Sequence, residues 1–525
     1  MFLDIKSPIN LWKDYDVETL PLNTSALSAK YKNDVTVKEY YFDGYTTVDG
    51  RVRAFIRIYE RTEAKGAILF LPDADERLSY DIAKSMYDQG FTVAVLDYLG
   101  KSQNQARYTI YPRSLSACNS EGLDKFEIAE DEKYSRWYIW TCISRRACLL
   151  LKQLYGNNVF ALGVGLGGST VYKLTAFDDG LKACATLANI IPTVIGEGNG
   201  IINYHASLDN YAYSSISKVP LYMAFSSNDE DGSFDEMSEL AQSTESLFHL
   251  RILERAFHNG ILSACPAISK FFDDIAANTQ IPFQAEIEPS NSDGNLYFNI
   301  TTINGENVGA LKLDLFVCFC MTDPSYRNWM KLNTIGLGEN KFMAQINVCN
   351  VNMPIYAFAN LISENGDVQS SALTTVLPKS LNIKEKTGVA HRKIYDGSMG
   401  TDCWTSRDGG IISQVQGPYG IDGVQSSTNS FTTFKPGDPL FKVSEDTMLQ
   451  IMLAGESQTI TISVRDKSAI YTCTIEISET EDWNKISLAH NNFKSESGML
   501  TDWTNILMLE FRSDKHFVIG SVLWV

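Results

Sequence analysis

The stretch from residue 159 to 169 limits the possible folds of this chain more than any other. It reads VFALGVGLGGS, an apolar run that ends in a glycine-dense turn, and a helix-compatible segment follows at residues 170–177. A short apolar run of this kind is typical of a buried strand, and glycine adopts the backbone conformations that a tight turn needs. The sequence therefore predicts a strand, a sharp elbow and a helix in immediate succession.

Short apolar runs alternate with helical patterns on both sides of this elbow. The predicted strands lie at residues 67–71, 91–96, 183–187, 221–225 and 250–253, and the predicted helices at 79–89, 131–155, 234–248 and 261–277. A hairpin of residues 35–42 and 52–60 precedes them, and residues 1–30 are predicted to form a surface arm. Strands that alternate with helices indicate a parallel sheet built of right-handed crossovers.

The pattern changes near residue 280. Residues 282–378 hold only short alternating runs separated by turn signals such as Asn304-Gly305, which predicts a small β-sandwich resembling the immunoglobulin or fibronectin type. Similar runs over residues 380–525 predict a second β-sandwich, a jelly roll. We therefore expect three domains, at residues 1–280, 281–378 and 379–525, in a chain too long for one core.

Composition and charge exclude several classes of partner. The chain of 525 residues has 45 basic and 63 acidic side chains and a net charge of −18, so we expect neither a nucleic-acid partner nor an anionic membrane surface. No apolar run is long enough to span a bilayer and no signal-peptide pattern is visible, which predicts a cytoplasmic protein, or a secreted one if a leader was removed. The ten cysteines include no CxxC and lie mostly in apolar segments, so we expect free thiols, no metal and no cofactor.

The elbow itself resembles a known motif. Gly163-Val164-Gly165-Leu166-Gly167 resembles the nucleophile elbow G-x-S-x-G of α/β-hydrolases, but Gly165 stands where that family carries serine. The resemblance covers roughly residues 35–278 and implies an α/β-hydrolase fold with a doubly wound, mostly parallel sheet. The helix around residues 135–147 looks like the one that precedes the elbow in bacterial acetyl-esterase and dienelactone-hydrolase-like proteins.

The resemblance also implies positions for the other site residues. In chain order the family places an acid and then a base after the elbow, and Asp229 and His258 are the matching residues. Asp231 and Asp235 remain alternatives for the acid. The oxyanion would be bound by the backbone N–H of Leu166 and by that of Asp73 or Ala74.

Gly165 decides what chemistry remains. Without a hydroxyl at the tip, His258 has nothing to deprotonate and no acyl-enzyme forms. Three explanations compete: a natural pseudoenzyme, an active serine esterase whose serine was replaced by glycine, or a displaced group such as Ser169 or a water activated by His258. We expect a relative of carbohydrate acetyl or acyl esterases that lacks serine-esterase activity.

The last module supports a rival hypothesis. Residues 483–488, 500–506 and 519–524 resemble the closing strands of carbohydrate-binding jelly rolls, which stack aromatic rings on sugars. Trp404 and Tyr419, both in glycine-rich loop sequence, are the candidates for stacking, whereas Trp483, Trp503 and Trp524 fit a core better. The rival is therefore a non-catalytic glycan-binding or scaffolding protein with a carbohydrate or acylated sugar as ligand, possible also as an oligomer.

Overall fold

A computed structural model describes most of the chain, in two compact units. The described residues are 6–32, 35–73, 76–100, 106–119, 131–177, 180–189, 199–279, 283–304, 312–338, 340–386, 391–441, 443–444 and 446–525. The first unit comprises Met1–Phe225, Asp231–Arg251 and Ile261–Pro282, and the second comprises Ser226–Glu230, Ile252–Gly260 and Phe283–Val525. Among the residues described, no helix is long and apolar enough to cross a membrane.

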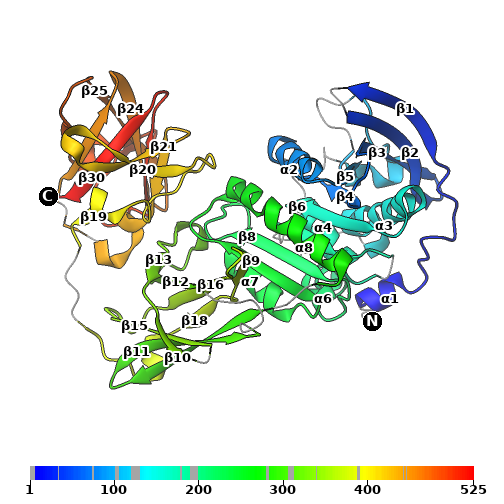
Figure 1. Cartoon of the computed structure of the whole chain (residues 1–525), viewed down its shortest axis with the longest axis horizontal. Helices are drawn as coiled ribbons and strands as arrows, with labels where there is room; N and C mark the ends of the chain where they lie inside the picture. The colour runs from blue at the N-terminus through cyan, green and yellow to red at the C-terminus, as the bar shows by residue number, and fades with distance from the viewer. Residues whose placement is uncertain are drawn as a thin grey trace. The chain divides into compact units, whose positions relative to one another are not determined.

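A nine-stranded sheet organises the first half of the chain (Figure 1). Its strands are β1 (Ser25–Lys32), β2 (Val35–Thr47), β3 (Gly50–Glu60), β4 (Ala67–Leu71), β5 (Thr92–Asp97), β6 (Val159–Val164), β7 (Cys184–Leu187), β8 (Leu221–Ser226) and β9 (Leu247–Leu253). Their order in space is β1-β2-β3-β5-β4-β6-β7-β8-β9. The β1–β2, β2–β3 and β3–β5 pairs are antiparallel, while β5, β4, β6, β7 and β8 run parallel. This is the doubly wound, mostly parallel sheet of the α/β-hydrolase fold, as the sequence predicts.

Eight α-helices in the described residues of this half accompany the sheet. They are α1 (Pro8–Trp12), α2 (Glu76–Asp88), α3 (Arg136–Tyr155), α4 (Leu166–Leu174), α5 (Asn199–Ser207), α6 (Tyr211–Ser214), α7 (Phe234–Ser243) and α8 (Cys265–Ala277). Helix α2 packs against α8, and α3 packs against α4. Helix α4 begins at Leu166, four residues before the predicted start, because Gly165 turns the chain directly from β6 into the helix.

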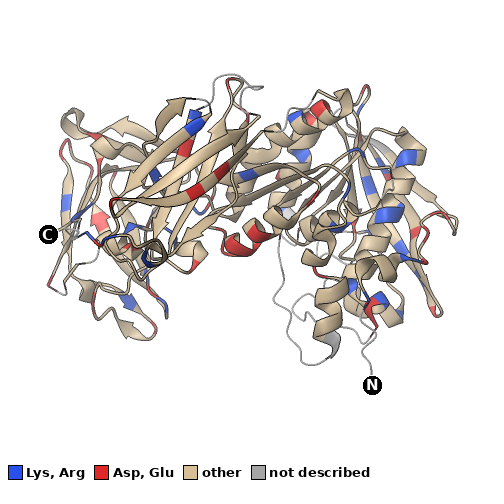
Figure 2. Ribbon diagram, turned by 90° about the horizontal axis from the view of Figure 1, so that it is seen from below, with Lys and Arg blue, Asp and Glu red and all other residues tan. Residues whose placement is uncertain are grey.

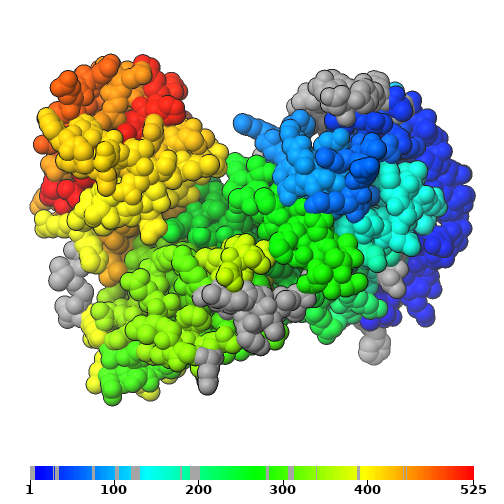
Figure 3. Space-filling view, viewed as in Figure 1, coloured from blue at the N-terminus to red at the C-terminus, as the bar shows by residue number. Residues whose placement is uncertain are grey.

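The N-terminal residues are not the surface arm that the sequence predicts. Trp12 is buried, its ring stacks on Tyr138 at 4.4 Å between centroids, and its Nε1 donates to the Tyr213 hydroxyl at 2.9 Å. Strand β1 then pairs with β2 at the edge of the sheet. In Figure 3 these dark blue residues lie along one edge of the first unit. The prediction was wrong because a single buried tryptophan in a one-and-a-half-turn helix leaves no periodic signal.

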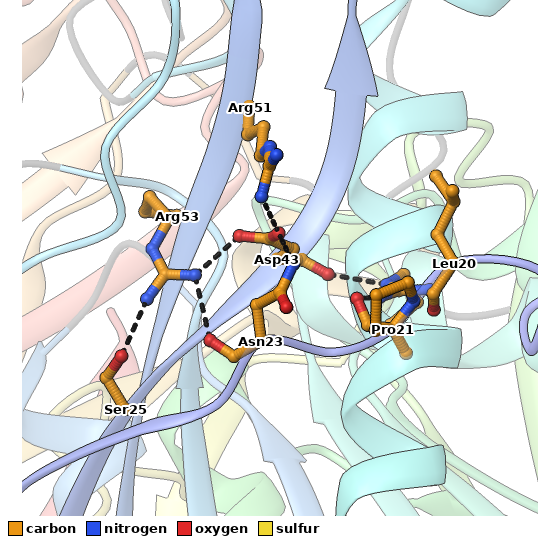
Figure 4. A network of polar contacts seen from close by, with 8 residues as sticks. Leu20, Pro21, Asn23, Ser25, Asp43, Arg51 and Arg53 are labelled. Atoms are coloured by element: carbon orange, nitrogen blue, oxygen red, sulfur yellow. Dashed lines mark hydrogen bonds and ion pairs between the residues drawn. The ribbon is translucent and has the colours of Figure 1, made fainter.

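A polar network fixes this segment to the sheet (Figure 4). The buried Asp43 carboxylate pairs with Arg51 at 2.8 Å and Arg53 at 2.5 Å and accepts from Asn23 at 2.7 Å. Beside it, Arg146 of α3 donates to four main-chain carbonyls, those of Asp43, Val17, Leu20 and Pro21. One helix side chain thus holds residues 17–21 against β2.

The second unit is built from antiparallel sheets. Strands β10 (Gln284–Ser292), β11 (Asn295–Ile303), β14 (Ile335–Gly338) and β15 (Lys341–Ile346) form one, and β12 (Lys312–Phe319), β13 (Met330–Leu332), β16 (Ile355–Ile362), β17 (Val368–Ser370) and β18 (Thr374–Val376) form another. The apolar faces of these two sheets supply one core, which includes Phe298, Leu315 and Ala357. This is a β-sandwich, as predicted.

Two further sheets follow in the last third of the chain. One contains β19 (Lys393–Asp396), β20 (Ile412–Gln416), β21 (Asp422–Ser426), β23 (Leu449–Gly455), β26 (Asn484–Leu488) and β30 (Phe517–Trp524). The other contains β22 (Ser430–Thr433), β24 (Gln458–Arg465), β25 (Ile470–Ile477), β27 (Lys494–Ser495), β28 (Gly498–Met499) and β29 (Met508–Arg512). Their core, which includes Ile451, Ile462 and Phe511, is separate from that of the first sandwich.

The cysteines are unpaired, and the charged residues are spread over the described parts of both units (Figure 2). All ten cysteines are free, and seven of them are buried. Acidic and basic positions are interspersed over the described helices and strands of both units, with no continuous basic stripe (Figure 2).

Candidate active site

The elbow has the sharp geometry that the glycines predict. Gly165 has φ 53° and ψ −117°, in the region that side chains with a Cβ rarely adopt. A Cβ on Gly163 would lie 2.2 Å from the carbonyl oxygen of Gly167, and a Cβ on Gly167 would lie 2.1 Å from that of Leu71. The outer glycines are therefore required by the close approach of α4 to the ends of β6 and β4.

The Asp73 side chain occupies the place of the missing nucleophile. A Cβ built on Gly165 would lie 2.4 Å from Asp73 Cγ and 2.5 Å from each carboxylate oxygen. The N–H of Leu166, predicted to bind the oxyanion, donates to Asp73 Oδ1 at 3.3 Å. The carboxylate of Asp73, which follows the neighbouring strand β4, therefore fills the space that a serine side chain at position 165 would need.

The loop that carries Asp73 is held on both sides. The buried Tyr98 donates its hydroxyl to the Pro72 carbonyl at 2.6 Å, and burial raises the pKa of that phenol well above its usual range. The backbone N–H of Asp73, predicted as an oxyanion donor, donates instead to Ser79 Oγ at 3.0 Å. The alternative donor, Ala74, lies outside the described residues. The Asp73 side chain therefore bonds to the elbow, whereas its backbone N–H bonds to Ser79 of α2.

The predicted acid and base form a hydrogen-bonded pair. His258 Nδ1 lies 3.0 and 3.2 Å from the two carboxylate oxygens of Asp229, and both side chains are largely buried. Asp229 follows β8, and His258 follows β9 at the start of a 3₁₀ helix, His258–Ala264. With Nδ1–H donated to the carboxylate, Nε2 is the nitrogen that can accept a proton. Of the acids left open by the sequence, Asp229 forms this hydrogen bond with the imidazole.

Ser169 does not replace the missing hydroxyl. It lies inside α4 with 1% of its surface exposed, and its Oγ donates to the carbonyl of Gly165 at 3.4 Å. A surface depression elsewhere in the first unit is lined by residues of α2 and α8, such as Lys84, Asp88 and Pro266, and by none of the predicted site residues. The Ser169 hydroxyl is therefore bonded within α4 and does not stand in for that of a serine at position 165.

The two aromatic candidates for sugar stacking have different surroundings. Trp404 is 5% exposed and packs in the last core against Tyr395, Phe431 and Phe511. A buried ring presents no face to a sugar, so the prediction is wrong for Trp404. Tyr419 is 76% exposed and has φ 60°, at the tip of a turn after β20. The remaining tryptophans predicted as core, Trp483, Trp503 and Trp524, are buried.

Sequence reasoning missed the role of the Asp73 carboxylate and the contacts that hold the acid and base loops. A signal for the first exists in the sequence, since a glycine at an elbow tip leaves room for a side chain from the neighbouring strand end. No local signal identifies the second, because the contacts join residues about a hundred positions apart.

Comparison with known structures finds esterases. Acetyl xylan esterase 1 from Thermoanaerobacterium sp. JW/SL YS485 is 12% identical, with a TM-score of 0.37 over 49% of this chain and 89% of its own. The acetyl xylan esterase from Paenibacillus sp. R4 is 10% identical, with a TM-score of 0.35 over 49% and 90%, and Est1E from Butyrivibrio proteoclasticus is 9% identical, with a TM-score of 0.31 over 49% and 99%. At these values the likeness concerns only the fold of about half the chain. No protein-family model matches the chain, and a search of curated proteins finds no relative.

Proposed function

We propose that this chain is an α/β-hydrolase-fold protein related to carbohydrate acetyl or acyl esterases that has lost serine-esterase activity. The observation that carries the proposal is the Asp73 carboxylate, which lies where the side chain of a nucleophile at position 165 would be. An acyl-enzyme needs a hydroxyl at this position and an unoccupied donor for the oxyanion. Here Gly165 offers no hydroxyl and Asp73 accepts from the Leu166 N–H.

The relation to esterases is supported by the chain order of the site residues and by the hydrogen bond between Asp229 and His258. The elbow follows β6, the acid follows β8 and the base follows β9, which is the family's chain order of nucleophile, acid and base. The pair Asp229–His258 keeps the hydrogen bond that orients a catalytic imidazole. A carbohydrate or acylated sugar as ligand is part of this proposal.

Restoration of the hydroxyl tests the proposal. Gly165→Ser alone places a Cβ against the carboxylate of Asp73, and a non-glycine residue at this φ costs about 1–3 kcal/mol. We therefore expect Gly165→Ser to remain inactive, and Gly165→Ser combined with Asp73→Ala to hydrolyse p-nitrophenyl acetate and to react with a fluorophosphonate probe. The unmodified chain should do neither.

The matched control is the triple variant that also carries His258→Ala. It should lose hydrolysis roughly 100-fold or more relative to the double variant, since general-base help of this kind is worth about 10²–10⁴-fold. Turnover of the ester by the unmodified chain, abolished by His258→Ala, would show that the esterase activity was never lost.

Glycan binding is a second candidate function, favoured by one observation. Tyr419 is a highly exposed aromatic ring at the tip of a glycine-flanked turn. Aromatic rings in such positions stack on the apolar faces of sugars. Retention of the chain on an insoluble polysaccharide should fall at least tenfold in Tyr419→Ala and stay unchanged in Tyr80→Ala, which removes another exposed tyrosine. Equal retention of both variants would remove Tyr419 as the glycan contact.

A further inference from the structure

We propose that the β-sandwich half of the chain is a working part of the acid–base site, with Asn228, Ser325 and Arg407 as positioning residues for Asp229 and His258. The loops Ser226–Glu230 and Ile252–Gly260, which carry this pair, belong to the second unit together with both sandwiches. The acid–base role of the pair rests on the proposed function. The inference about how the two loops are held is independent of it, because all the contacts concerned lie within the second unit.

The acid loop is tied to the first sandwich through buried hydrogen bonds. Asn228 is fully buried, and its Nδ2 donates to the carbonyls of Arg327 at 2.9 Å and Ser325 at 3.2 Å. In return, Ser325 Oγ donates to the carbonyl of Asp229 at 3.2 Å. The main chain on both sides of the acid is therefore fixed by the segment between β12 and β13, which holds the 3₁₀ helix Pro324–Tyr326.

That segment is itself rigidly held. The Arg327 side chain is fully buried, its Nε donates to the Met321 carbonyl at 3.1 Å, and its guanidinium lies 3.6 Å from the centroid of the Tyr356 ring in β16. Trp329, also buried, donates through Nε1 to the carbonyl of Ser227 at 3.4 Å. A buried, fully bonded anchor of this kind defines one position for the acid loop.

The base loop is held by both sandwiches. Phe257, the residue before His258, packs with Tyr326 of the first sandwich and with Phe434, Leu507 and Met508 of the last. At the start of the loop the N–H of Ile252 donates to Ser370 Oγ at 2.7 Å, and Asn360 Nδ2 donates to Glu254 at 2.9 Å. The base therefore follows a residue that is packed in a hydrophobic cluster shared by both modules.

Arg407 joins the two loops. It forms an ion pair with Glu230, the residue after the acid, and its guanidinium lies 5.5 Å from the ring centroid of Phe257, the residue before the base. The loops also bond directly to each other, since Arg255 N–H donates to Ser227 Oγ at 2.7 Å and Asn228 N–H to the Ala256 carbonyl at 3.0 Å. A side chain of the last sandwich therefore contacts the immediate neighbours of both members of the pair.

The consequence concerns the hydrogen bond between His258 and Asp229. A carboxylate within hydrogen-bond distance favours the charged imidazolium and raises the pKa of a histidine. If the sandwiches fix the positions of the two loops, loss of one contact between a sandwich and a loop lengthens this hydrogen bond. The titration midpoint of His258 then falls. A sandwich that only stabilises the fold would leave that midpoint unchanged in a folded variant.

The test is a titration of the full chain labelled with ¹³C in its six histidine rings. The Hε1–Cε1 signal of His258 is assigned by its absence in His258→Gln. We expect Ser325→Ala, which removes a hydrogen bond to the Asp229 carbonyl and no charge, to lower the midpoint of this signal by about half a pH unit or more, a threefold change in proton affinity. Arg407→Lys, which keeps the positive charge but loses the planar guanidinium, should shift the midpoint in the same direction by less. The other five histidines should not shift.

Arg512→Lys is the matched control for Arg407→Lys, since Arg512 lies in the same sandwich and pairs with Glu510 and Asp408 rather than with either loop. If Ser325→Ala does not fold, Arg407→Lys remains as the second variant. An unchanged His258 midpoint in folded Ser325→Ala, or in Arg407→Lys if only that variant folds, overturns the proposal. Because the titration needs no activity, it separates this inference from the proposed loss of esterase function.

Discussion

Lys173 of α4 shows how far one buried side chain departs from its ordinary chemistry. It is 2% exposed, it donates to the Ser169 carbonyl and to Asn210, and its ammonium lies 4.8 Å from the centroid of the Trp137 ring. Burial lowers the pKa of this lysine to about 7, although the charge of Asp209 acts in the opposite direction. The site has partners for a charge but too little water to solvate it.

The pKa of Lys173 makes stability depend on pH. Between the folded value of about 7 and the unfolded value near 10.5, the unfolded chain binds more protons, so the free energy of unfolding rises with pH by up to about 1.4 kcal/mol per unit. Lys173→Met lacks this contribution. We expect the stability of the natural chain relative to Lys173→Met to increase from pH 7 to pH 10, measured by urea unfolding.

The control for this experiment is Lys84→Met, which changes an exposed lysine of α2. Its unfolding free energy should run parallel to that of the natural chain over the same pH range. Parallel curves for Lys173→Met as well would mean that Lys173 is charged in the folded protein throughout.

Residue 165 illustrates what a sequence can and cannot state at this scale. The sequence shows directly that position 165 has no hydroxyl, and its glycine pattern predicts the tight elbow. It does not predict that the carboxylate of Asp73 lies over Gly165. That arrangement requires β4 and β6 to be neighbours in the sheet, and their order is a tertiary property.

At the scale of elements, α3 is more than the amphipathic core helix that its apolar stripe predicts. Its buried Arg146 donates to the carbonyls of Val17, Leu20 and Pro21, all of them in the segment between α1 and β1 (Figure 4 shows Leu20 and Pro21). A planar guanidinium with five donors suits this arrangement and an ammonium does not.

Arg146→Met should therefore release that segment. Hydrogen bonds from a charged donor contribute about 1.5–3 kcal/mol each when buried, and the three carbonyls that Arg146 binds in this segment belong to residues that are exposed or half-buried, so we expect a loss of roughly 2–4 kcal/mol in unfolding free energy for the set. Limited proteolysis should then cut between residues 13 and 25 before any other region of the first unit.

Arg113→Met, a change at an exposed arginine, provides the comparison and should alter neither stability nor the cleavage pattern. Cleavage at residues 13–25 at the same rate in the natural chain and in Arg146→Met would show that the network does not hold the segment.

At the scale of the whole molecule, the division into units does not follow the chain boundary near residue 280. The loops that carry Asp229 and His258 leave β8 and β9 but belong to the second unit, where Asn228 and Phe257 are buried. The sequence assigns these loops to the hydrolase-like domain because they lie between its strands and helices, and nothing local reports their distant partners.

A chain that ends at residue 282 should therefore be incomplete. It keeps Asn228 and Phe257 but lacks the partners from Ser325 to Met508 that bury them. We expect this fragment to bind the dye ANS, to aggregate at micromolar concentration and to unfold at a temperature several degrees below that of the full chain. A monomeric fragment with the melting temperature of the full chain would contradict the assignment of these loops to the second unit.

The sequence by itself determined most of the elements, the α/β and all-β halves and the elbow, and it named His258 with Asp229, Asp231 or Asp235 as its acid. These follow from periodicity, from glycine sterics and from the fixed chain order of a known motif, all of which are written along the chain. Only the tertiary structure decided that Asp73 fills the elbow, that Trp404 lies in a core, and that the sandwiches hold the acid and base loops. Each of these depends on which surfaces meet across long sequence separations, and hydrophobic patterning specifies that a face is buried without specifying against what.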